Sequence, residues 1–369
     1  MSTMRACYYT EYGKADKVLK FGELPMPELE GPNDVLIKVH AASINPADFK
    51  HCEGELRMVM SRPFPIKPGF DFSRVIVKKG DGVGERLNVG DEVFGMIRGL
   101  RTGTTAEFIV VDEHVISKKP ANLSHKEAAG VPLAAITAFQ CLSKAGLTYP
   151  PSADAQSKSV FVTGGPGGVG TFVIQVAKKM FAVGTVVTTA GGAAKAEVCK
   201  SLGADEVIDY KSVDFRTALK GRKFDACVDC TGETSKMVGL VKEKGGITTI
   251  QTNITTEMLR EWLNALGPNP GITPVPIVKS AIFALPQSVI NLFTGASFLR
   301  HRLPSGAVFH SIITVPSREV LDKIANHLEN GEVRVLIDQV FPLDQSRDAY
   351  LRSASGKAVG KVIVDVIPS

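Results

Sequence analysis

The sequence predicts an α/β protein of two parts: a doubly wound parallel sheet and a smaller part built from antiparallel strands. The length of 369 residues exceeds that of one ordinary domain. Short alternating apolar runs, separated by Gly, Pro and Asp, fill residues 4–120. From residue 159 onward, strand-type and helix-type runs alternate instead. That alternation favours a parallel sheet with helices packed on it.

The antiparallel part is predicted from alternation with a period of two. Val35, Ile37 and Val39 are apolar and their neighbours are polar, as in a half-buried strand. Further strands are expected within residues 70–80, 88–96 and 105–116. Turn residues separate them, which indicates a small barrel or sandwich.

The parallel part begins with an apolar run at 159–163 and a helix whose apolar face is Val169, Phe172, Val173, Val176 and Met180. Expected elements then follow in order: strand 184–190, helix 193–205 ending at Gly203, strands 206–210, 224–230 and 245–250, helix 317–333 stopped at Gly331, and strand 360–366.

A Pro- and Gly-broken apolar segment covers about 251–309. Its part from Pro274 to Leu299 has no acidic residue, but Lys279 and the prolines interrupt it, so we do not expect it to span a membrane. We expect it to fold over a cleft or to form a dimer contact, with extra core under a long loop as the alternative.

Composition and charge exclude several classes of protein. Apolar residues make up 44% and charged residues 22%, as in soluble globular proteins. The net charge of +5 is mild and no basic run stands out, so a nucleic-acid partner is not expected. The N-terminus lacks the apolar run of a signal peptide, which predicts a cytoplasmic location. A mitochondrial location would require a longer precursor.

The decisive motif is Gly165-Pro166-Gly167-Gly168-Val169-Gly170, a G-x-G-x-x-G that follows a strand and opens a helix. Glycines there permit a tight turn and the approach of backbone N–H groups to a pyrophosphate. Gly165, Gly167, Gly168 and Val169 are therefore candidate cofactor contacts. A phosphate-binding P-loop is excluded because no lysine follows Gly170.

The end of the second strand favours NADPH over NADH. An NAD site usually has an acid there, whereas this chain has Thr188, Thr189, Gly191 and Gly192. Thr189, Gly191 and Lys195 can therefore contact a 2′-phosphate. The alternative is that Lys195 is a solvated helix residue.

An ordered series of motifs resembles the medium-chain dehydrogenase/reductase superfamily, and within it the zinc-free quinone oxidoreductase group that includes zeta-crystallin-like and reticulon-4-interacting-protein-like reductases. The matching stretches are "SINPADFK", "PGFDFSRVIV", "VGDEVFG", "VPLAAITAFQCL", "VFVTGGPGGVGTFVIQVAK", "SLGADEVIDYK", "FDACVDCTG" and "GKVIVDV". The resemblance implies a GroES-like substrate domain from residues 1–130 and 311–369. It also implies a Rossmann NADPH-binding domain at 131–310, with the apolar insertion and a cleft between the domains.

The same resemblance implies roles for single residues. Asn45 and Thr137 would lie near the nicotinamide, and Asn45 would help to position the substrate. Tyr210 would lie against the adenosine phosphate, while Thr231 and Lys361 would approach the cofactor. The alternatives are a turn residue before Pro46 for Asn45 and a surface aromatic for Tyr210.

Departures from the group leave the proton donor unassigned. Related reductases often have a tyrosine shortly after "NP", where this chain has Phe49 and Cys52. Asp48, Lys50 and His51 remain candidates, but we expect Lys50 and His51 to be solvated and Asp48 to be structural. Water is the alternative donor.

Two further departures concern charge and metal. The group commonly has Gly where this chain has Arg74. The zinc members carry a Cys in the segment after the first long strand, but "AASINPADFK" has none. They also carry a cluster of four cysteines, which the six cysteines of this chain do not form. Cys227 and Cys230 form a C-x-x-C, but inside a segment that reads as a buried strand. No metal site is expected.

These observations predict an NADPH-dependent oxidoreductase that transfers hydride to a quinone or an α,β-unsaturated carbonyl. One alternative is an enoyl-thioester reductase. An alternative of another class is a non-catalytic NADPH-binding protein of crystallin, RNA-binding or scaffold type. We expect a small electrophilic substrate and a homodimer.

Overall fold

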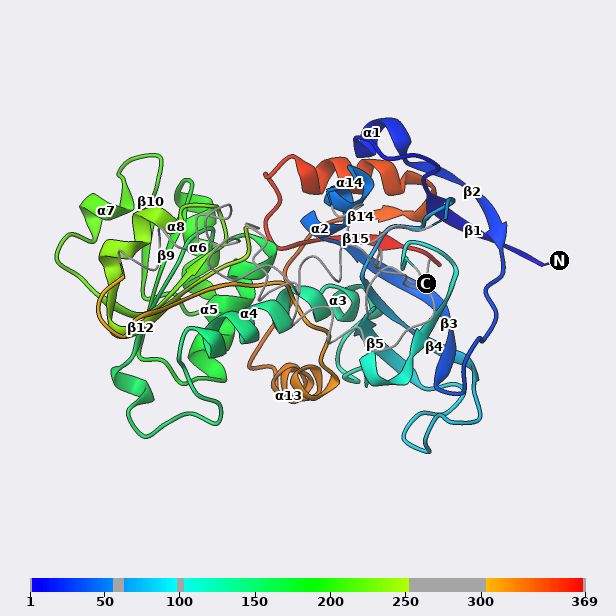
Figure 1. Cartoon of the computed structure of the whole chain (residues 1–369), viewed down its shortest axis with the longest axis horizontal. Helices are drawn as coiled ribbons and strands as arrows, with labels where there is room; N and C mark the ends of the chain where they lie inside the picture. The colour runs from blue at the N-terminus through cyan, green and yellow to red at the C-terminus, as the bar shows by residue number, and fades with distance from the viewer. Residues whose placement is uncertain (1, 56–62, 98–102, 252–302, 368–369) are drawn as a thin grey trace, which may run out of the picture.

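The computed structural model describes residues 2–55, 63–97, 103–251 and 303–367. Two lobes lie side by side, each built on one large sheet (Figure 1). Both ends of the chain lie in the lobe of the mainly antiparallel sheet, whereas the middle of the chain forms the other lobe. This arrangement agrees with the predicted fold class, and the exact domain limits 1–130, 131–310 and 311–369 stay a prediction.

The parallel sheet has the strand order β10-β9-β8-β11-β12-β13, and every neighbouring pair is parallel. Its strands are β8 (Ser159–Val162), β9 (Thr185–Ala190), β10 (Glu206–Asp209), β11 (Phe224–Asp229), β12 (Val241–Thr249) and β13 (Val308–Ser311). The order reverses between β8 and β11. In sheets of this kind, a ligand binds beyond the carboxyl ends of the strands at that point.

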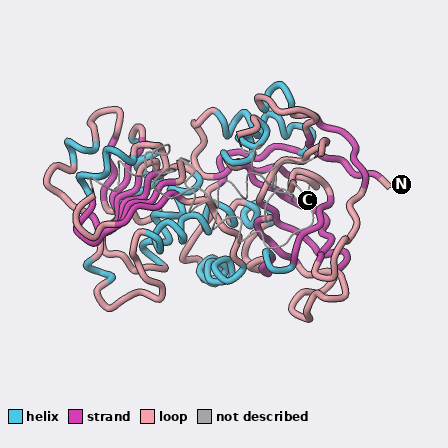
Figure 2. The backbone as a smooth tube through the Cα atoms, in the orientation of Figure 1, coloured by secondary structure: helices cyan, strands magenta, loops and turns pink. Residues whose placement is uncertain are grey.

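Helices cover both faces of this sheet (Figure 2). They are α4 (Pro132–Lys144), α5 (Gly168–Lys179), α6 (Ala193–Ser201), α7 (Phe215–Ala218) and α8 (Thr234–Met237). The predicted apolar face of α5 is confirmed, because Phe172, Val173 and Val176 are buried in the core shared with α4. Gly203 follows α6 with a φ of +107°, the left-handed conformation expected at a helix end.

The second sheet joins strands from both ends of the chain. Its order is β14-β15-β3-β4-β5-β7, with β6 paired to β3, and only β14 and β15 are parallel to each other. These strands are β3 (Asp34–Ile44), β4 (Asp71–Lys79), β5 (Glu92–Met96), β6 (Phe108–Asp112), β7 (Ile116–Lys118), β14 (Ile337–Pro342) and β15 (Lys361–Asp365). A separate antiparallel pair is β1 (Thr3–Tyr8) and β2 (Lys20–Pro25).

Shorter helices surround this second sheet. They are α1 (Ala15–Val18), α2 (Pro46–Cys52), α3 (His125–Ala129) and α14 (Ser346–Ala354). The helix α13 (Arg318–Glu329) leads the chain back from the parallel lobe, and Gly331 follows it with a φ of +70°, as predicted. The segment before α13 is held against α4 by two hydrogen bonds between the Gln140 side chain and the backbone of Val315, at 2.7 and 3.1 Å.

The strand β13 was not predicted from the sequence. Residues 308–309 were assigned to the apolar insertion, but they begin β13, which pairs in parallel with β12. The register joins Gly246 to Val308 across more than sixty residues of sequence, a pairing that local patterns cannot reveal. The stretch Pro274–Leu299 lies outside the described residues. Within the described residues, no helix is long and apolar enough to cross a membrane.

Candidate functional site

The glycine motif forms a tight turn between β8 and α5. Gly164 has a φ of +69°, and Gly165 N–H donates to Thr189 O at 3.1 Å. Two motif glycines are required by the protein's own packing. A Cβ on Gly165 would lie 2.3 Å from Thr188 Oγ1, and one on Gly170 would lie 2.2 Å from Gly164 O. Neither site has room for a side chain.

Gly167 differs, because a Cβ there would meet only Gly164 O, at 3.2 Å. The described residues therefore leave the space over Gly167 open. The first N–H groups of α5 have no acceptor within their own helix, and they add partial positive charge at this corner. An open cradle beside these donors fits a pyrophosphate, so the residues present suit a dinucleotide cofactor.

The antiparallel sheet meets this turn through β15. Gly360 N–H donates to Pro166 O at 2.9 Å, which places the next residue, Lys361, against the motif. The Lys361 side chain is buried, with its Cδ 3.2 Å from the position of a Cβ on Gly168. Its Nζ donates to Asn45 Oδ1. Two residues implied by resemblance, Lys361 and Asn45, are thus brought together beside the glycine turn.

Asn45 lies at the start of α2 and is buried. Its backbone N–H donates to Asp48 Oδ2 at 2.7 Å, and its Nδ2 donates to Asp71 Oδ2 at 2.8 Å. Burial raises the pKa of Asp48 well above its ordinary value. The expectation that His51 is solvated is wrong, because the ring is buried and packs edge-on against Phe70. Lys50 is half-buried.

Thr137 and Thr231 lie on different elements, α4 and the end of β11. Thr137 Oγ1 donates to Leu133 O at 2.6 Å within α4, and it also makes a hydrogen bond with Thr314 Oγ1. Thr231 follows β11, and its Cγ2 lies 2.9 Å from the position of a Cβ on Gly164. The Thr231 contact therefore joins the ends of β8 and β11, where the strand order reverses.

A second group of predicted residues gathers beyond β9. The Tyr210 hydroxyl lies 2.6 Å from the position of a Cβ on Gly191, so the ring rests on that glycine. Tyr210 is 56% exposed, which leaves its outer face open to a ligand. Lys195 Nζ donates to Lys357 O at 3.4 Å. Thr189 is buried, and its hydroxyl accepts a bond from Gly164 N–H at 3.0 Å, so it shapes the turn.

Sequence reasoning missed Lys211 in this group. Its Cε lies 3.2 Å from the position of a Cβ on Gly191, beside the Tyr210 ring. The signal was its place directly after Tyr210 at the end of β10. Asp209 fixes this corner, because its Oδ1 accepts bonds from the N–H groups of Gly192 and Lys211 at 3.2 and 3.0 Å.

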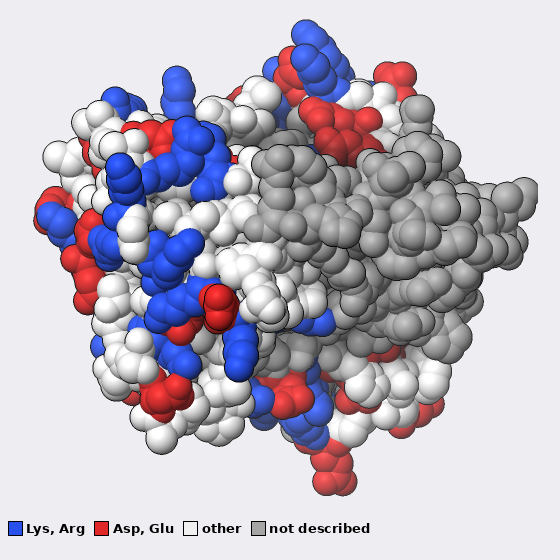
Figure 3. Space-filling model, turned by 60° about the vertical axis from the view of Figure 1, so that its left-hand side comes forward, with Lys and Arg blue, Asp and Glu red and all other residues white. Residues whose placement is uncertain are grey.

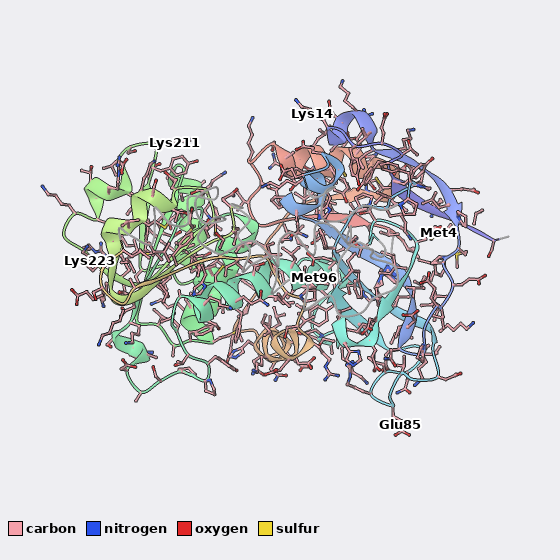
Figure 4. The ribbon with its side chains drawn as sticks, viewed as in Figure 1. Met4, Lys14, Glu85, Met96, Lys211 and Lys223 are labelled. Carbon is pink, nitrogen blue, oxygen red and sulfur yellow. The ribbon has the colours of Figure 1, made fainter. Side chains whose placement is uncertain are left out.

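Basic side chains are prominent on one face of the parallel lobe (Figure 3). Lys211 projects outward from this lobe, far from Met96 in the other one (Figure 4). Several basic side chains of this lobe are paired with acids: Lys178 with Asp205, Lys200 with Glu197 and Arg222 with Glu206. For Lys195 and Lys211 no such ion pair is found among the described residues.

Comparisons with known proteins agree with this geometry. The profile of the family described as "Alcohol dehydrogenase GroES-like domain" matches residues 31–121, and that of "Zinc-binding dehydrogenase" matches residues 202–364. A 2-methylene-furan-3-one reductase of Solanum lycopersicum is 34% identical, over 100% of this chain and 80% of the relative. The mitochondrial NAD(P)H oxidoreductase RTN4IP1 of Homo sapiens is 32% identical, over 99% of this chain and 90% of the relative.

The chain belongs to the medium-chain dehydrogenase/reductase superfamily. A solved structure of a quinone oxidoreductase from Coxiella burnetii superimposes with a TM-score of 0.77, covers 99% of this chain and 100% of its own, and is 26% identical. Membership makes the protein an oxidoreductase and confirms the resemblance found in the sequence.

Zinc is a point on which members of this superfamily differ. Across the described residues, no three His, Cys, Asp or Glu side chains form a group that could hold a metal ion. Five of the six cysteines are buried, and burial raises the pKa of the Cys227 and Cys230 thiols. Zinc independence itself stays a prediction, which a metal assay can test.

Proposed function

We propose that this protein is an NADPH-dependent oxidoreductase that transfers hydride to a quinone or to the β-carbon of an α,β-unsaturated carbonyl. The observation that carries the proposal is the glycine turn, which is open over Gly167 and has Lys361 of the other lobe, hydrogen-bonded to Asn45, beside Gly168. A nicotinamide cofactor bound there would supply the hydride. The chain's own task is to bind and orient the reactants.

The residues divide this task among themselves. The N-terminus of α5 and the space over Gly167 would hold the pyrophosphate, with the Lys361 ammonium beside it. Asn45 would position the nicotinamide and substrate from the antiparallel lobe, and Thr137 from α4. No side chain is assigned as proton donor, so in this proposal water supplies the proton that completes enone reduction.

The relatives support a nicotinamide cofactor, and the preference for NADPH over NADH is our proposal. No acid follows β9, where one would repel a 2′-phosphate. Lys195, Lys211 and the exposed face of Tyr210 surround the Gly191 corner instead. Two flexible ammonium groups and a hydroxyl are suitable partners for a phosphate.

A substrate panel tests the proposed function. Oxidation of NADPH by the purified protein is followed with quinones, small enones and enoyl thioesters. We expect turnover of quinones or enones with NADPH. Turnover of long-chain enoyl thioesters alone would favour the alternative reductase, and NADPH binding without turnover of any of these would favour a non-catalytic role.

We further propose a cytosolic homodimer. Among the described residues, one edge of the parallel sheet is β13, where Val308 is 40% exposed, and an edge strand can pair with a second copy. Light scattering after size exclusion tests the dimer. Fractionation of cells that express the natural gene tests the compartment, since relatives include mitochondrial forms.

A further inference from the structure

Asp71 of β4 is a buried carboxylate that accepts several hydrogen bonds near the turn, and no catalytic or binding role has been given to it above. The side chain is completely buried. Its Oδ2 accepts hydrogen bonds from Ser43 Oγ and Asn45 Nδ2, both at 2.8 Å. Its Oδ1 accepts from Leu133 N–H at 2.8 Å. Lys361 Nζ lies 3.7 Å from Oδ2.

These contacts fix the orientation of the Asn45 amide. A carboxylate only accepts hydrogen bonds, so the amide must turn its NH₂ group toward Asp71. Its Oδ1 then faces Lys361, whose ammonium only donates. Asp71, Asn45 and Lys361 therefore form a hydrogen-bonded series in which the Asn45 amide can satisfy both neighbours in only one orientation.

The chain of contacts connects the antiparallel sheet to the glycine motif. Lys361 passes beside Gly168, and Leu133 lies at the start of α4, the helix that carries Thr137. One carboxylate thus contacts β3, α2, α4 and β15 at once. If Asp71 served only to link these elements, a neutral hydrogen-bonding side chain would be sufficient. A buried carboxylate 3.7 Å from the lysine beside the glycine turn would not be needed.

We propose that Asp71 is a positioning residue that keeps Lys361 cationic and the Asn45 amide in one orientation beside the cofactor pyrophosphate. The proposal rests on the proposed function, because it assigns to Lys361 the charge that binds the dinucleotide. It adds a residue that acts on the cofactor only through two others.

The surrounding charges predict in which direction the pKa of Lys361 shifts when the Asp71 charge is removed. Burial lowers the pKa of Lys361, and the Asp71 and Asp48 carboxyls oppose this shift. Burial raises the pKa of Asp71, which Lys361 opposes in turn. In the described residues, Asp71 and Asp48 are the ionisable groups found to act on Lys361. Removing the Asp71 charge should therefore make Lys361 lose its proton at lower pH.

The test measures the affinity for NADPH by calorimetry between about pH 6.5 and 10, the range below and around the ordinary lysine pKa. In the wild type, affinity should fall as pH rises through the pKa of Lys361. In Asp71→Asn, this fall should move to lower pH by roughly 1–3 units, the usual effect of an opposite charge nearby. Near neutral pH, the two proteins should differ little.

Three further variants separate charge from structure. Ser43→Ala removes one hydrogen bond to Asp71 but keeps its charge, so its pH profile should match the wild type. Lys361→Arg should bind at all pH values tested, because a guanidinium keeps its proton. The double variant Asp71→Asn/Lys361→Arg should regain the affinity at high pH that Asp71→Asn has lost.

A uniform loss of affinity in Asp71→Asn, with no displacement along the pH axis, would overturn the proposal and leave Asp71 a structural residue. If Asp71→Asn does not fold, Asp71→Ser removes the same charge, and its hydroxyl with one water can take over the hydrogen bonds. Absence of NADPH binding by the wild type at every pH would instead refute the proposed function itself.

Discussion

Lys361, Arg74 and Lys195 are all cations, yet their surroundings give them different tasks. Lys361 is buried beside a carboxylate, Arg74 is buried without a hydrogen-bond partner among the described residues, and Lys195 is half-exposed at the cofactor corner. The sequence pointed to all three through resemblance, departure or position. It missed Asp71 and Lys211, whose importance comes from partners remote in sequence.

Lys195 and Lys211 should set the preference for NADPH. One charge-assisted contact to phosphate contributes roughly 1.5–3 kcal/mol, about 10- to 150-fold in affinity. We expect Lys195→Glu to remove most of the preference for NADPH over NADH, and Lys211→Glu to weaken it further. Dissociation constants of both cofactors, measured by calorimetry, give the ratio.

The matched control is Lys200→Glu on the same helix, whose ammonium pairs with Glu197 at 2.9 Å. It makes the same change of net charge away from the corner, so the cofactor ratio should stay at the wild-type value. If Lys195→Glu discriminates as well as the wild type does, Lys195 is only a solvated charge.

Arg74 should cost the protein stability. Alternation along β4 places it on the side of Phe72 and Ile76, which lie in the apolar core, and burial lowers its pKa well below the ordinary value. We expect Arg74→Met to raise the unfolding free energy by about 1–4 kcal/mol, the range found when buried charges are replaced by apolar groups. Chemical denaturation at neutral pH measures this.

Arg86→Met is the control, since its guanidinium donates to Glu113 O at 3.1 Å at a partly exposed site and should give no such gain. A less stable Arg74→Met protein would mean that the guanidinium has a partner in solution.

At the scale of elements, the strength of the local pattern decided which predictions succeeded. The helix α5 was predictable because five apolar residues recur at helical spacing after a glycine turn. The strands β8, β9 and β11 are buried runs of the kind expected in a parallel sheet. β13 has four residues of mixed character, and only its pairing with β12 defines it.

The glycine turn allows binding to be separated from folding. Gly167→Val should leave the protein folded and weaken NADPH binding at least about tenfold, because the side chain occupies the space that the pyrophosphate needs. Gly170→Ala should instead lower the thermal midpoint, since its Cβ would lie 2.2 Å from Gly164 O, a backbone atom that cannot swing away. Unchanged NADPH affinity in Gly167→Val would place the cofactor elsewhere.

At the scale of the whole molecule, the sequence alone could not show which remote segments pair. β15 lies between β14 and β3, although about 300 residues of sequence separate β15 from β3, and no local period announces that contact. The resemblance predicted a domain built from both ends of the chain. The alternation of strands and helices predicted a parallel sheet, but not the order of its six strands. Asn45 and Lys361 meet because of this long-range pairing.

The contacts among Asp71, Asn45 and Lys361 also support the expectation that the protein holds no zinc. Asp71, which lies 3.7 Å from the Lys361 ammonium, already accepts three hydrogen bonds. A cation placed there would displace these donors and meet a like charge. We therefore expect elemental analysis of the purified protein to find zinc far below one ion per chain, and chelator treatment to leave NADPH-dependent turnover unchanged. Stoichiometric zinc whose removal abolishes turnover, and whose return restores it, would place a metal at the active site and contradict this expectation.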